Sequence, residues 1–358
     1  MIRIKRLRVP CDLGLCRSLF AVLVDNCLES VSKSVNGGLD ASEELCDKNF
    51  LRRNVSESFN SLSVNNLTVK VTSEDGEGLN LFCILLENLC GSDGFPRASK
   101  RQGAWMTNFV NQRNIGGENV RPMIVNVCNF TAPQGDTPAL LNIDETRTLF
   151  HEFGHALHGM LTQTHYPNVS GTNVKHDFVE LFSQINEKWS VHPDVMPTFA
   201  KHYQTGEAIP AELIEKMQKS SHFNLGFETT ELVAAALLDM KMHLVGDYTN
   251  FDCNEYENEL RKELGFIPEI EYRYRSTNFA HVFGGGYAVG YYAYLWAEVL
   301  DCDAFELFLE KGVFDPATAA SFKQLLEMGG SKDPMREYRR FRGADPNPDA
   351  LLRARGLI

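Results

Sequence analysis

One short stretch of the chain combines residue types and spacing that could bind a metal ion. Residues 149–161 read LFHEFGHALHGML, in which His151, Glu152 and His155 form the pattern His-Glu-x-x-His. Residues four apart lie on the same face of a helix, so two imidazoles at this spacing can bind one zinc ion. The glutamate after the first histidine can act as general base toward a metal-bound water. The stretch therefore predicts one zinc ion per chain and hydrolytic chemistry.

A helix over this stretch would have two contrasting sides. At about 100° per residue, His151, His155 and His158 fall on one narrow arc. The opposite arc is apolar and holds Leu149, Phe150, Phe153, Leu157, Met160 and Leu161. An exposed face rich in histidine is the competing interpretation, but exposed faces normally carry Lys and Glu. For His158 alone, lining a pocket, facing water and contacting the metal site all stay open.

A catalytic zinc site needs a third protein ligand and keeps one position open for water. Glu180 follows His155 by 25 residues, enough for a loop and an antiparallel return helix. Glu187, on the same face seven residues later, is a rival ligand, and a solvated surface acid is the alternative for Glu180. Asp177 could instead accept a hydrogen bond from the outer nitrogen of a ligating histidine.

A third region, residues 281–294, reads HVFGGGYAVGYYAY. Its three consecutive glycines predict a permissive loop. A phosphate-binding function is disfavoured because neither the G-x-G-x-x-G pattern nor a following Lys-Ser/Thr is present. The tyrosines could pack as a core helix face. Alternatively, His281, Tyr287 and Tyr294 could donate hydrogen bonds to a developing oxyanion, where one donor is worth roughly 3 kcal/mol.

The elements that would position these residues are mainly helical. Alternation predicts a strand at Leu67–Thr72, and Leu79–Leu86 can form a second strand after the turn Glu74–Gly78. The β-branched content of Pro122–Phe130 predicts a third strand. Gly91–Arg101 and Thr131–Pro138 are predicted loops. Asn142 or Asp144 would cap the metal-site helix, with Glu145 completing a capping box. Helical spacing then recurs at Asp177–Trp189, Asp194–Tyr203, Pro210–Ser220, Glu228–Val245, Asn254–Leu264, Tyr287–Leu300, Ala304–Lys311, Pro316–Met328, Pro334–Phe341 and Pro348–Arg355.

Composition narrows the class of protein. The chain has 358 residues, 43% of them hydrophobic and 23% charged, with a net charge of −12. The absence of a clustered basic footprint argues against a nucleic-acid partner. Nine cysteines without a Cys-x-x-Cys favour a reducing compartment over a disulfide framework. Arg17 interrupts the apolar run near the N-terminus, and no run is long enough to span a membrane. We expect a soluble, cytoplasmic monomer without membrane contact.

Three stretches together resemble the thimet oligopeptidase family of zinc metallopeptidases: FHEFGHALHGM, SGTNVKHDFVE and YRSTNFAHVFGGGYAVGYYAYLWAEVLDCDAFE. The wording of the last stretch is closest to the family's bacterial peptidyl-dipeptidases. The likeness extends from about Gly103 to the C-terminus. It implies a multi-helical, zincin-like catalytic domain with a small β-sheet, which we place at residues 67–358. Residues 1–66 stay unassigned.

The resemblance also implies residue roles. His151, His155 and Glu180 would bind zinc, and Glu152 would be the base. His281, Tyr287 and Tyr294 would engage the carbonyl and backbone of the substrate, a short peptide. Family members are about twice as long as this chain, because their N-terminal half forms a helical roof over a deep channel, and that half is replaced here.

The expected activity is zinc-dependent hydrolysis of short peptides with release of C-terminal dipeptides. Arg273 or Arg275 could hold the free carboxylate of such a substrate. Endo-acting cleavage by the same family is one alternative. A catalytically inactive truncated chain that only binds zinc is another, and a non-peptidase zinc hydrolase is a third.

Overall fold

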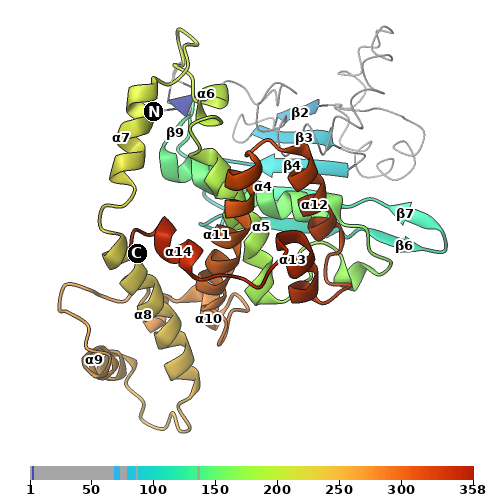
Figure 1. The fold of residues 1–358 in the computed structure, drawn as a ribbon. Helices are drawn as coiled ribbons and strands as arrows, with labels where there is room; N and C mark the ends of the chain where they lie inside the picture. The colour runs from blue at the N-terminus through green and yellow to red at the C-terminus, as the bar shows by residue number, and fades with distance from the viewer. Residues whose placement is uncertain (1, 4–67, 73–78, 86–87, 135–137) are drawn as a thin grey trace, which may run out of the picture.

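The computed structural model describes residues 2–3, 68–72, 79–85, 88–134 and 138–358. A small sheet lies beside two central helices, α4 (Ile143–Leu161) and α5 (His176–Ser190). Figure 1 shows the sheet on one side of this pair, and an arm that includes α7 (Ala211–Ser220), α8 (Leu225–His243) and α9 (Cys253–Glu263) extending from the body of the molecule. The mainly helical architecture with a small sheet confirms the expected fold class. Residues 4–66 lie outside the described residues.

The main sheet has the strand order β2-β3-β4-β8-β5. Its strands are β2 (Thr68–Thr72), β3 (Leu79–Leu85), β4 (Asn88–Asp93), β5 (Trp105–Val110) and β8 (Met123–Val127). β2 and β3 form the expected antiparallel pair, whereas β4 and β8 are parallel. The loop expected at Gly91–Arg101 is wrong for its first residues, because β4 continues to Asp93. Turn 74–78 lies outside the described residues.

Shorter strands complete the β structure. β6 (Arg113–Ile115) and β7 (Glu118–Val120) form a separate hairpin, which projects from the body in Figure 1. β1 (Ile2–Arg3) pairs with β9 (Leu140–Leu141). β9 ends one residue before Asn142, the N-cap of α4.

Helix α4 begins with the capping box that the sequence predicts. Asn142 is the N-cap, and its side chain accepts a hydrogen bond from the Glu145 backbone N–H at 2.8 Å. The Glu145 carboxylate accepts from the Asn142 N–H at 3.0 Å. Two backbone donors that the first turn leaves unpaired are thereby satisfied. The helix continues to Leu161 and buries Leu157, Met160 and Leu161.

A very close approach of α4 and α5 depends on Gly154. A Cβ built at this residue would lie 2.3 Å from the Phe182 carbonyl oxygen and 2.7 Å from the Ser183 Cα. Any side chain at position 154 would therefore overlap the backbone of α5. The glycine inside His-Glu-x-x-His lets the return helix bring its carboxylates to the histidines.

Helix α11 (Ala293–Lys311) packs on the other side of α5. The two helices expected at Tyr287–Leu300 and Ala304–Lys311 are wrong as separate elements. The acids between them do not break the helix, because both are buried and paired: Asp301 lies 2.7 Å from Lys188, and Asp303 lies 3.2 Å from Arg342. The chain before Ala293 forms turns rather than helix.

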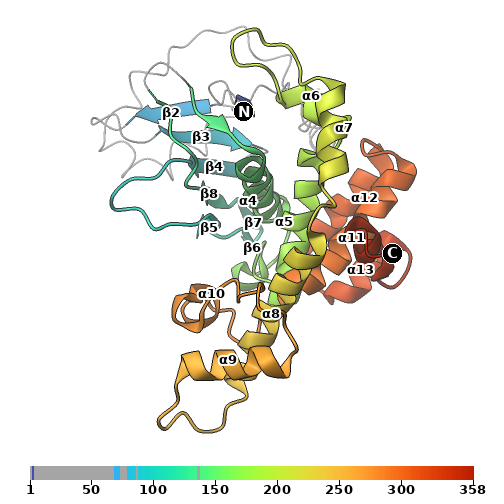
Figure 2. The same ribbon diagram turned by 90° about the vertical axis from the view of Figure 1, so that its left-hand side faces the viewer.

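Two further helices pack against this pair and close the main core. They are α12 (Pro316–Glu327) and α13 (Pro334–Arg342), each capped by an aspartate that precedes a proline. Figure 2 shows α11, α12 and α13 on the side of α4 and α5 that is away from the sheet. The core between them holds the buried rings of Phe182, Trp189, Phe308, Phe322 and Tyr338.

The remaining helices form the arm and the C-terminus. They are α6 (Met196–Phe199), α7 (Ala211–Ser220), α8 (Leu225–His243), α9 (Cys253–Glu263), α10 (Ala280–Phe283) and α14 (Asp349–Ala354). The helix expected at Asp194–Tyr203 is mostly wrong, because a bridge between Lys201 and Ala208 turns the chain away after α6. Among the described residues, no helix is long and apolar enough to cross a membrane.

Candidate metal centre

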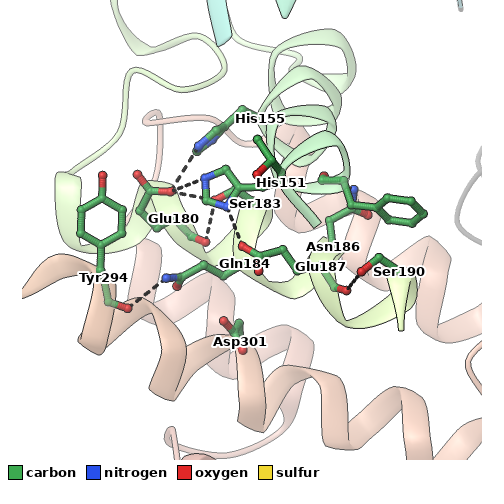
Figure 3. A network of polar contacts seen from close by, with 12 residues as sticks. His151, His155, Glu180, Ser183, Gln184, Asn186, Glu187, Ser190, Tyr294 and Asp301 are labelled. Atoms are coloured by element: carbon green, nitrogen blue, oxygen red, sulfur yellow. Dashed lines mark hydrogen bonds and ion pairs between the residues drawn. The ribbon is translucent and has the colours of Figure 1, made fainter. Parts of the chain in front are cut away.

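His151, His155 and Glu180 converge at one point between α4 and α5 (Figure 3). The Nε2 atoms of the two histidines lie 3.3 Å and 3.2 Å from the same oxygen, Oε2 of Glu180. Ligand atoms held about 2.0–2.1 Å from a tetrahedral zinc lie roughly 3.3 Å apart. Two imidazoles and one carboxylate are also the donor set of many catalytic zinc sites. The residues present therefore fit a zinc ion.

The charges of these groups are strongly coupled. Burial disfavours the ionised form of Glu180, but the neighbouring His155 and His151 outweigh it and hold the pKa of Glu180 well below its ordinary value. Burial likewise opposes protonation of His151, yet Glu180 and Glu187 keep the pKa of His151 well above its ordinary value. An ionised carboxylate of this kind is ready to accept a cation.

Glu187 orients one of the histidines. Its Oε1 lies 2.7 Å from Nδ1 of His151, the ring nitrogen that faces away from Glu180. From the sequence, Glu187 is a rival ligand and Asp177 a possible orienting acid, but in the structure Glu187 occupies the orienting position and Asp177 does not contact the histidines. Asp177 instead accepts a hydrogen bond from the Tyr292 hydroxyl at 3.3 Å.

Two more side chains on α5 support this arrangement. The Ser183 hydroxyl donates to Oε2 of Glu180 at 2.8 Å, which fixes the carboxylate. Asn186 donates to the Phe150 carbonyl of α4 at 2.5 Å, which ties the two helices together beside the first histidine. These supporting residues were not identified from the sequence, although they lie one and two turns after Glu180.

Glu152 lies next to the converged side chains and is almost fully buried, with 4% of the residue exposed. Its Oε2 has no hydrogen-bond partner among the described residues. Burial raises the pKa of Glu152 above its ordinary value. A buried carboxylate with an unpartnered oxygen and a raised pKa is suited to accept and return a proton.

His158 lies in the apolar core and does not join the metal centre. The residue is 0% exposed, and its ring lies 4.1 Å from the Phe182 ring, centroid to centroid. Neither ring nitrogen has a hydrogen-bond partner among the described residues. Burial lowers the pKa of His158 to about 3, so the ring is neutral at ordinary pH.

The glycine-rich segment brings two tyrosines next to Glu180. The Tyr287 hydroxyl donates to Oε1 of Glu180 at 2.8 Å. The rings of Tyr287 and Tyr294 are stacked, with centroids 5.4 Å apart. Burial, together with the charge of Glu180, raises the pKa of both phenols. Both hydroxyls therefore stay protonated and can donate hydrogen bonds.

His281 lies at the edge of the same aromatic group. Its ring centroid is 6.2 Å from those of Tyr287 and of Tyr294. Desolvation lowers the pKa of His281 below its ordinary value, which favours a neutral ring at neutral pH. The structure thus brings His281, Tyr287 and Tyr294 together, the three residues to which the family resemblance assigns substrate contacts.

The two candidate arginines differ in their surroundings. Arg275 forms an ion pair with the buried carboxylate of Glu257 and donates to the Asn254 side chain at 2.9 Å. Arg273 has no carboxylate partner within ion-pair distance among the described residues, and its guanidinium lies 5.7 Å from the Tyr274 ring centroid. The Tyr274 ring in turn lies 5.8 Å from that of His281. Of the two arginines, Arg273 is therefore the better placed to bind the free carboxylate of a substrate.

A helix that carries His-Glu-x-x-His, with a glutamate from the next helix, is the arrangement of ligands typical of zinc metallopeptidases. Comparison with known proteins agrees with this class. Residues 90–357 match the sequence profile of Peptidase family M3, and the chain belongs to that family.

Curated relatives carry related names. The dipeptidyl carboxypeptidase of Escherichia coli (strain K12) is 45% identical over 291 residues, which cover 80% of this chain and 41% of the relative. The oligopeptidase A of Haemophilus influenzae is 39% identical over 271 residues, covering 74% of this chain and 40% of the relative. The chain thus spans less than half of the length of these relatives.

One solved structure is also similar. It is that of a protein described as an oligoendopeptidase F, from Bacillus anthracis str. Ames, and it is 16% identical with a TM-score of 0.45. The match covers 74% of this chain and 39% of that chain. The family assignment rests on the sequence matches.

Proposed function

We propose that this chain is the catalytic portion of a zinc peptidase that hydrolyses short peptides and releases C-terminal dipeptides. The observation that carries the proposal is the convergence of His151, His155 and Glu180 beside the unpartnered oxygen of Glu152. Three ligands and an adjacent base are the parts that a hydrolytic zinc site needs. We propose zinc, one ion per chain, as the metal.

The residues of this chain would divide the reaction between them. His151, His155 and Glu180 would hold the zinc, which lowers the pKa of a bound water and polarises a carbonyl. Glu152 would take the proton of the attacking water on its free oxygen and then pass it to the leaving amine. Its buried position keeps bulk water from competing for that proton.

The protonated phenols would act on the substrate carbonyl. Tyr287 already donates to Glu180 at 2.8 Å, so its hydroxyl lies close enough to turn toward a substrate oxygen at the metal. Tyr294 stacks on it and His281 lies at the edge of the same group. Donors held in place before the substrate binds need no reorganisation during the reaction.

Release of dipeptides requires a group that recognises a free C-terminus. Arg273 could bind the terminal carboxylate, because its planar guanidinium has no acidic partner among the described residues and lies beside the aromatic group. A relative that is 45% identical to this chain is named a dipeptidyl carboxypeptidase, which agrees with this choice. Endo-acting cleavage is the second candidate, because other relatives are named oligopeptidases.

The test is hydrolysis of an N-acetylated tetrapeptide by the purified chain with zinc. We expect release of the C-terminal dipeptide, lost by a factor of about 100 or more in Glu152→Gln, which removes the base. Glu212→Gln is the matched control, since Glu212 is exposed and pairs with Lys216 on α7. Zinc bound by the wild-type chain without hydrolysis would instead identify an inactive zinc-binding chain.

A second comparison separates the two modes of cleavage. The same tetrapeptide with an amidated C-terminus should be cleaved much more slowly than the free acid, and Arg273→Met should remove that difference. Arg113→Met, at an exposed position in β6, is the control. Equal cleavage of the free and amidated peptides by the wild-type chain would favour the endo-acting mode.

A further inference from the structure

A buried acid outside the metal centre holds the segment that carries the tyrosines. Asp239, on α8, is 1% exposed, and both oxygens of its carboxylate accept backbone hydrogen bonds from that segment. Oδ1 accepts from the Val289 N–H at 2.9 Å, and Oδ2 accepts from the Tyr291 N–H at 2.9 Å. His243, one turn later on α8, contributes a third contact, with Nδ1 3.0 Å from Oδ1.

The backbone that Asp239 binds has an unusual conformation. Val289 has a φ of 56°, in the left-handed region that a β-branched residue rarely occupies. Such a residue persists in this region only when the surrounding structure holds it there. The two hydrogen bonds to Asp239 flank Gly290 and fix the backbone on both sides of it. The segment therefore depends on a contact with another helix for its shape.

The shape of this segment bears on where the Tyr287 phenol lies. Residues 284–292 connect α10 to α11, and Tyr287 lies within them, two residues before Val289. The Tyr287 backbone N–H donates to the His281 carbonyl at 3.0 Å, and its own carbonyl accepts from the Gly290 N–H at 2.8 Å. The backbone of Tyr287 is thus bonded to the same turn that Asp239 fixes. A shift of this turn would move the Tyr287 hydroxyl away from Glu180.

We propose that Asp239 is a positioning residue for the peptidase reaction: its carboxylate fixes the turn at Val289–Tyr291 and thereby holds the Tyr287 hydroxyl at the metal centre. This inference rests on the proposed function for its kinetic consequence, but the backbone contact can be tested without it. Asp239 touches neither the converged ligands nor Glu152, and it acts through the turn.

The test compares Asp239→Asn with the wild-type chain. An asparagine keeps the size of the side chain but offers one acceptor oxygen, and its NH₂ group faces a backbone N–H, so one of the two hydrogen bonds is lost. Asp247→Asn is the matched control, because Asp247 is exposed and also accepts a backbone N–H, that of Thr249 at 2.8 Å. Amide hydrogen exchange of residues 284–292, zinc affinity, kcat and KM are measured for each chain.

We expect faster exchange of the Val289 and Tyr291 amides in Asp239→Asn, by about tenfold or more, because the lost hydrogen bond lets the turn that carries both amides open locally. We expect kcat to fall about 10-fold to 100-fold, since small misplacements of a catalytic group cost rates of that order. KM and zinc affinity should stay near the wild-type values. A structural role in α8 alone would lower thermal stability without this split between kcat and KM.

A second substitution tests the strained residue directly. Adding Val289→Gly to Asp239→Asn should restore part of kcat. Glycine occupies the left-handed region without strain, so the turn depends less on the hydrogen bonds to Asp239. If Asp239→Asn does not fold, Asp239→Glu replaces it. The longer carboxylate keeps both acceptor oxygens but displaces them, so we expect a smaller loss of kcat with the same rise in exchange.

Each outcome decides the inference. Unchanged exchange in Asp239→Asn would overturn it, and so would faster exchange with unchanged kcat. A wild-type chain without peptidase activity would refute the proposed function alone. In that case, amide hydrogen exchange alone tests whether Asp239 fixes the turn. Faster exchange in Asp239→Asn would show that it does, and unchanged exchange would show that it does not.

Discussion

Glu187 lies 2.7 Å from Nδ1 of His151, on the side of the imidazole opposite to Glu180. When Nδ1 carries the proton, the lone pair of Nε2 points toward the converged ligand atoms. A carboxylate in this position fixes both the tautomer and the orientation of a metal-binding histidine. Helix α5 would therefore contribute to the proposed metal centre in two ways, through the ligand Glu180 and through Glu187, which would orient the ligand His151.

Removing that acid should weaken metal binding. We expect Glu187→Ala to lower the zinc affinity by about 10-fold to 100-fold, as is typical when an orienting partner of a ligand is lost. Competition with a chelator of known affinity measures the change. Glu212→Ala serves as the control at an exposed position of α7, and an affinity equal to that of the wild type in Glu187→Ala would contradict the role.

The close approach of α4 and α5 predicts an effect of a single methyl group. Gly154→Ala would place a Cβ 2.3 Å from the Phe182 carbonyl oxygen, so the helices must separate. We expect a loss of stability of about 1–3 kcal/mol, as for overpacked cores, together with weaker zinc binding. Denaturant unfolding and chelator competition measure the two effects.

The matched control for this substitution is also a helical glycine. A Cβ at Gly226, in the first turn of α8, would meet nothing within 4 Å. Gly226→Ala should therefore leave zinc binding unchanged and should not destabilise the chain. A normal zinc affinity in Gly154→Ala would show that α5 can move without displacing Glu180.

The phenol of Tyr287 should contribute to the rate more than to substrate binding. Tyr287→Phe removes a donor next to Glu180, and we expect kcat to fall about 100-fold to 1,000-fold, the loss typical of one oxyanion donor. Steady-state kinetics on the acetylated tetrapeptide test this. Tyr292→Phe, which removes only an exposed contact with Asp177, should keep a near-normal kcat, and similar losses in both variants would count against a specific role.

His158 predicts a pH dependence of stability. Its pKa is about 3 in the folded chain, against an ordinary value of 6.5. Below pH 6.5 the unfolded chain binds a proton that the folded chain does not, so this histidine destabilises the fold increasingly as the pH falls toward 3. Between pH 7 and pH 5 this costs about 2 kcal/mol.

Replacing this histidine should remove that part of the acid sensitivity. We expect the free energy of unfolding of His158→Leu to fall by about 2 kcal/mol less than that of the wild type between pH 7 and pH 5. Denaturant unfolding at both pH values measures the difference. His222→Leu is the control at an exposed histidine. Equal losses in wild type and His158→Leu would show that His158 accepts a proton in the folded chain.

Local patterns predicted the arrangement of the side chains where one helix decides it. The period of α4 places His151 and His155 on one face, and the pair Asn142 and Glu145 marks its start. The third ligand depends on how α5 crosses α4, which spacing alone leaves open. Glu180 and Glu187 share a face of α5, and in the structure Glu180 reaches Nε2 of both histidines whereas Glu187 reaches Nδ1 of His151.

The segment before α11 shows why other predictions were wrong. Its apolar spacing is helical from Tyr287 onward, but the helix begins at Ala293. Asp239 draws the backbone of residues 289 and 291 toward α8, and this contact between distant parts of the chain overrides the local preference. Strand β5 was also missed, and its residues are mostly half-buried rather than alternating between buried and exposed.

The position of the ligands on two separate helices has a thermodynamic consequence. Because His155 and Glu180 are 25 residues apart, a bound zinc ion would act as a reversible cross-link that closes the loop between α4 and α5. An ion that binds only the folded chain stabilises it by about 2.7 kcal/mol at a free concentration 100 times its Kd. The melting temperature should therefore follow the free zinc concentration, so the metal content of this chain would determine both its chemistry and how long α4 and α5 stay together.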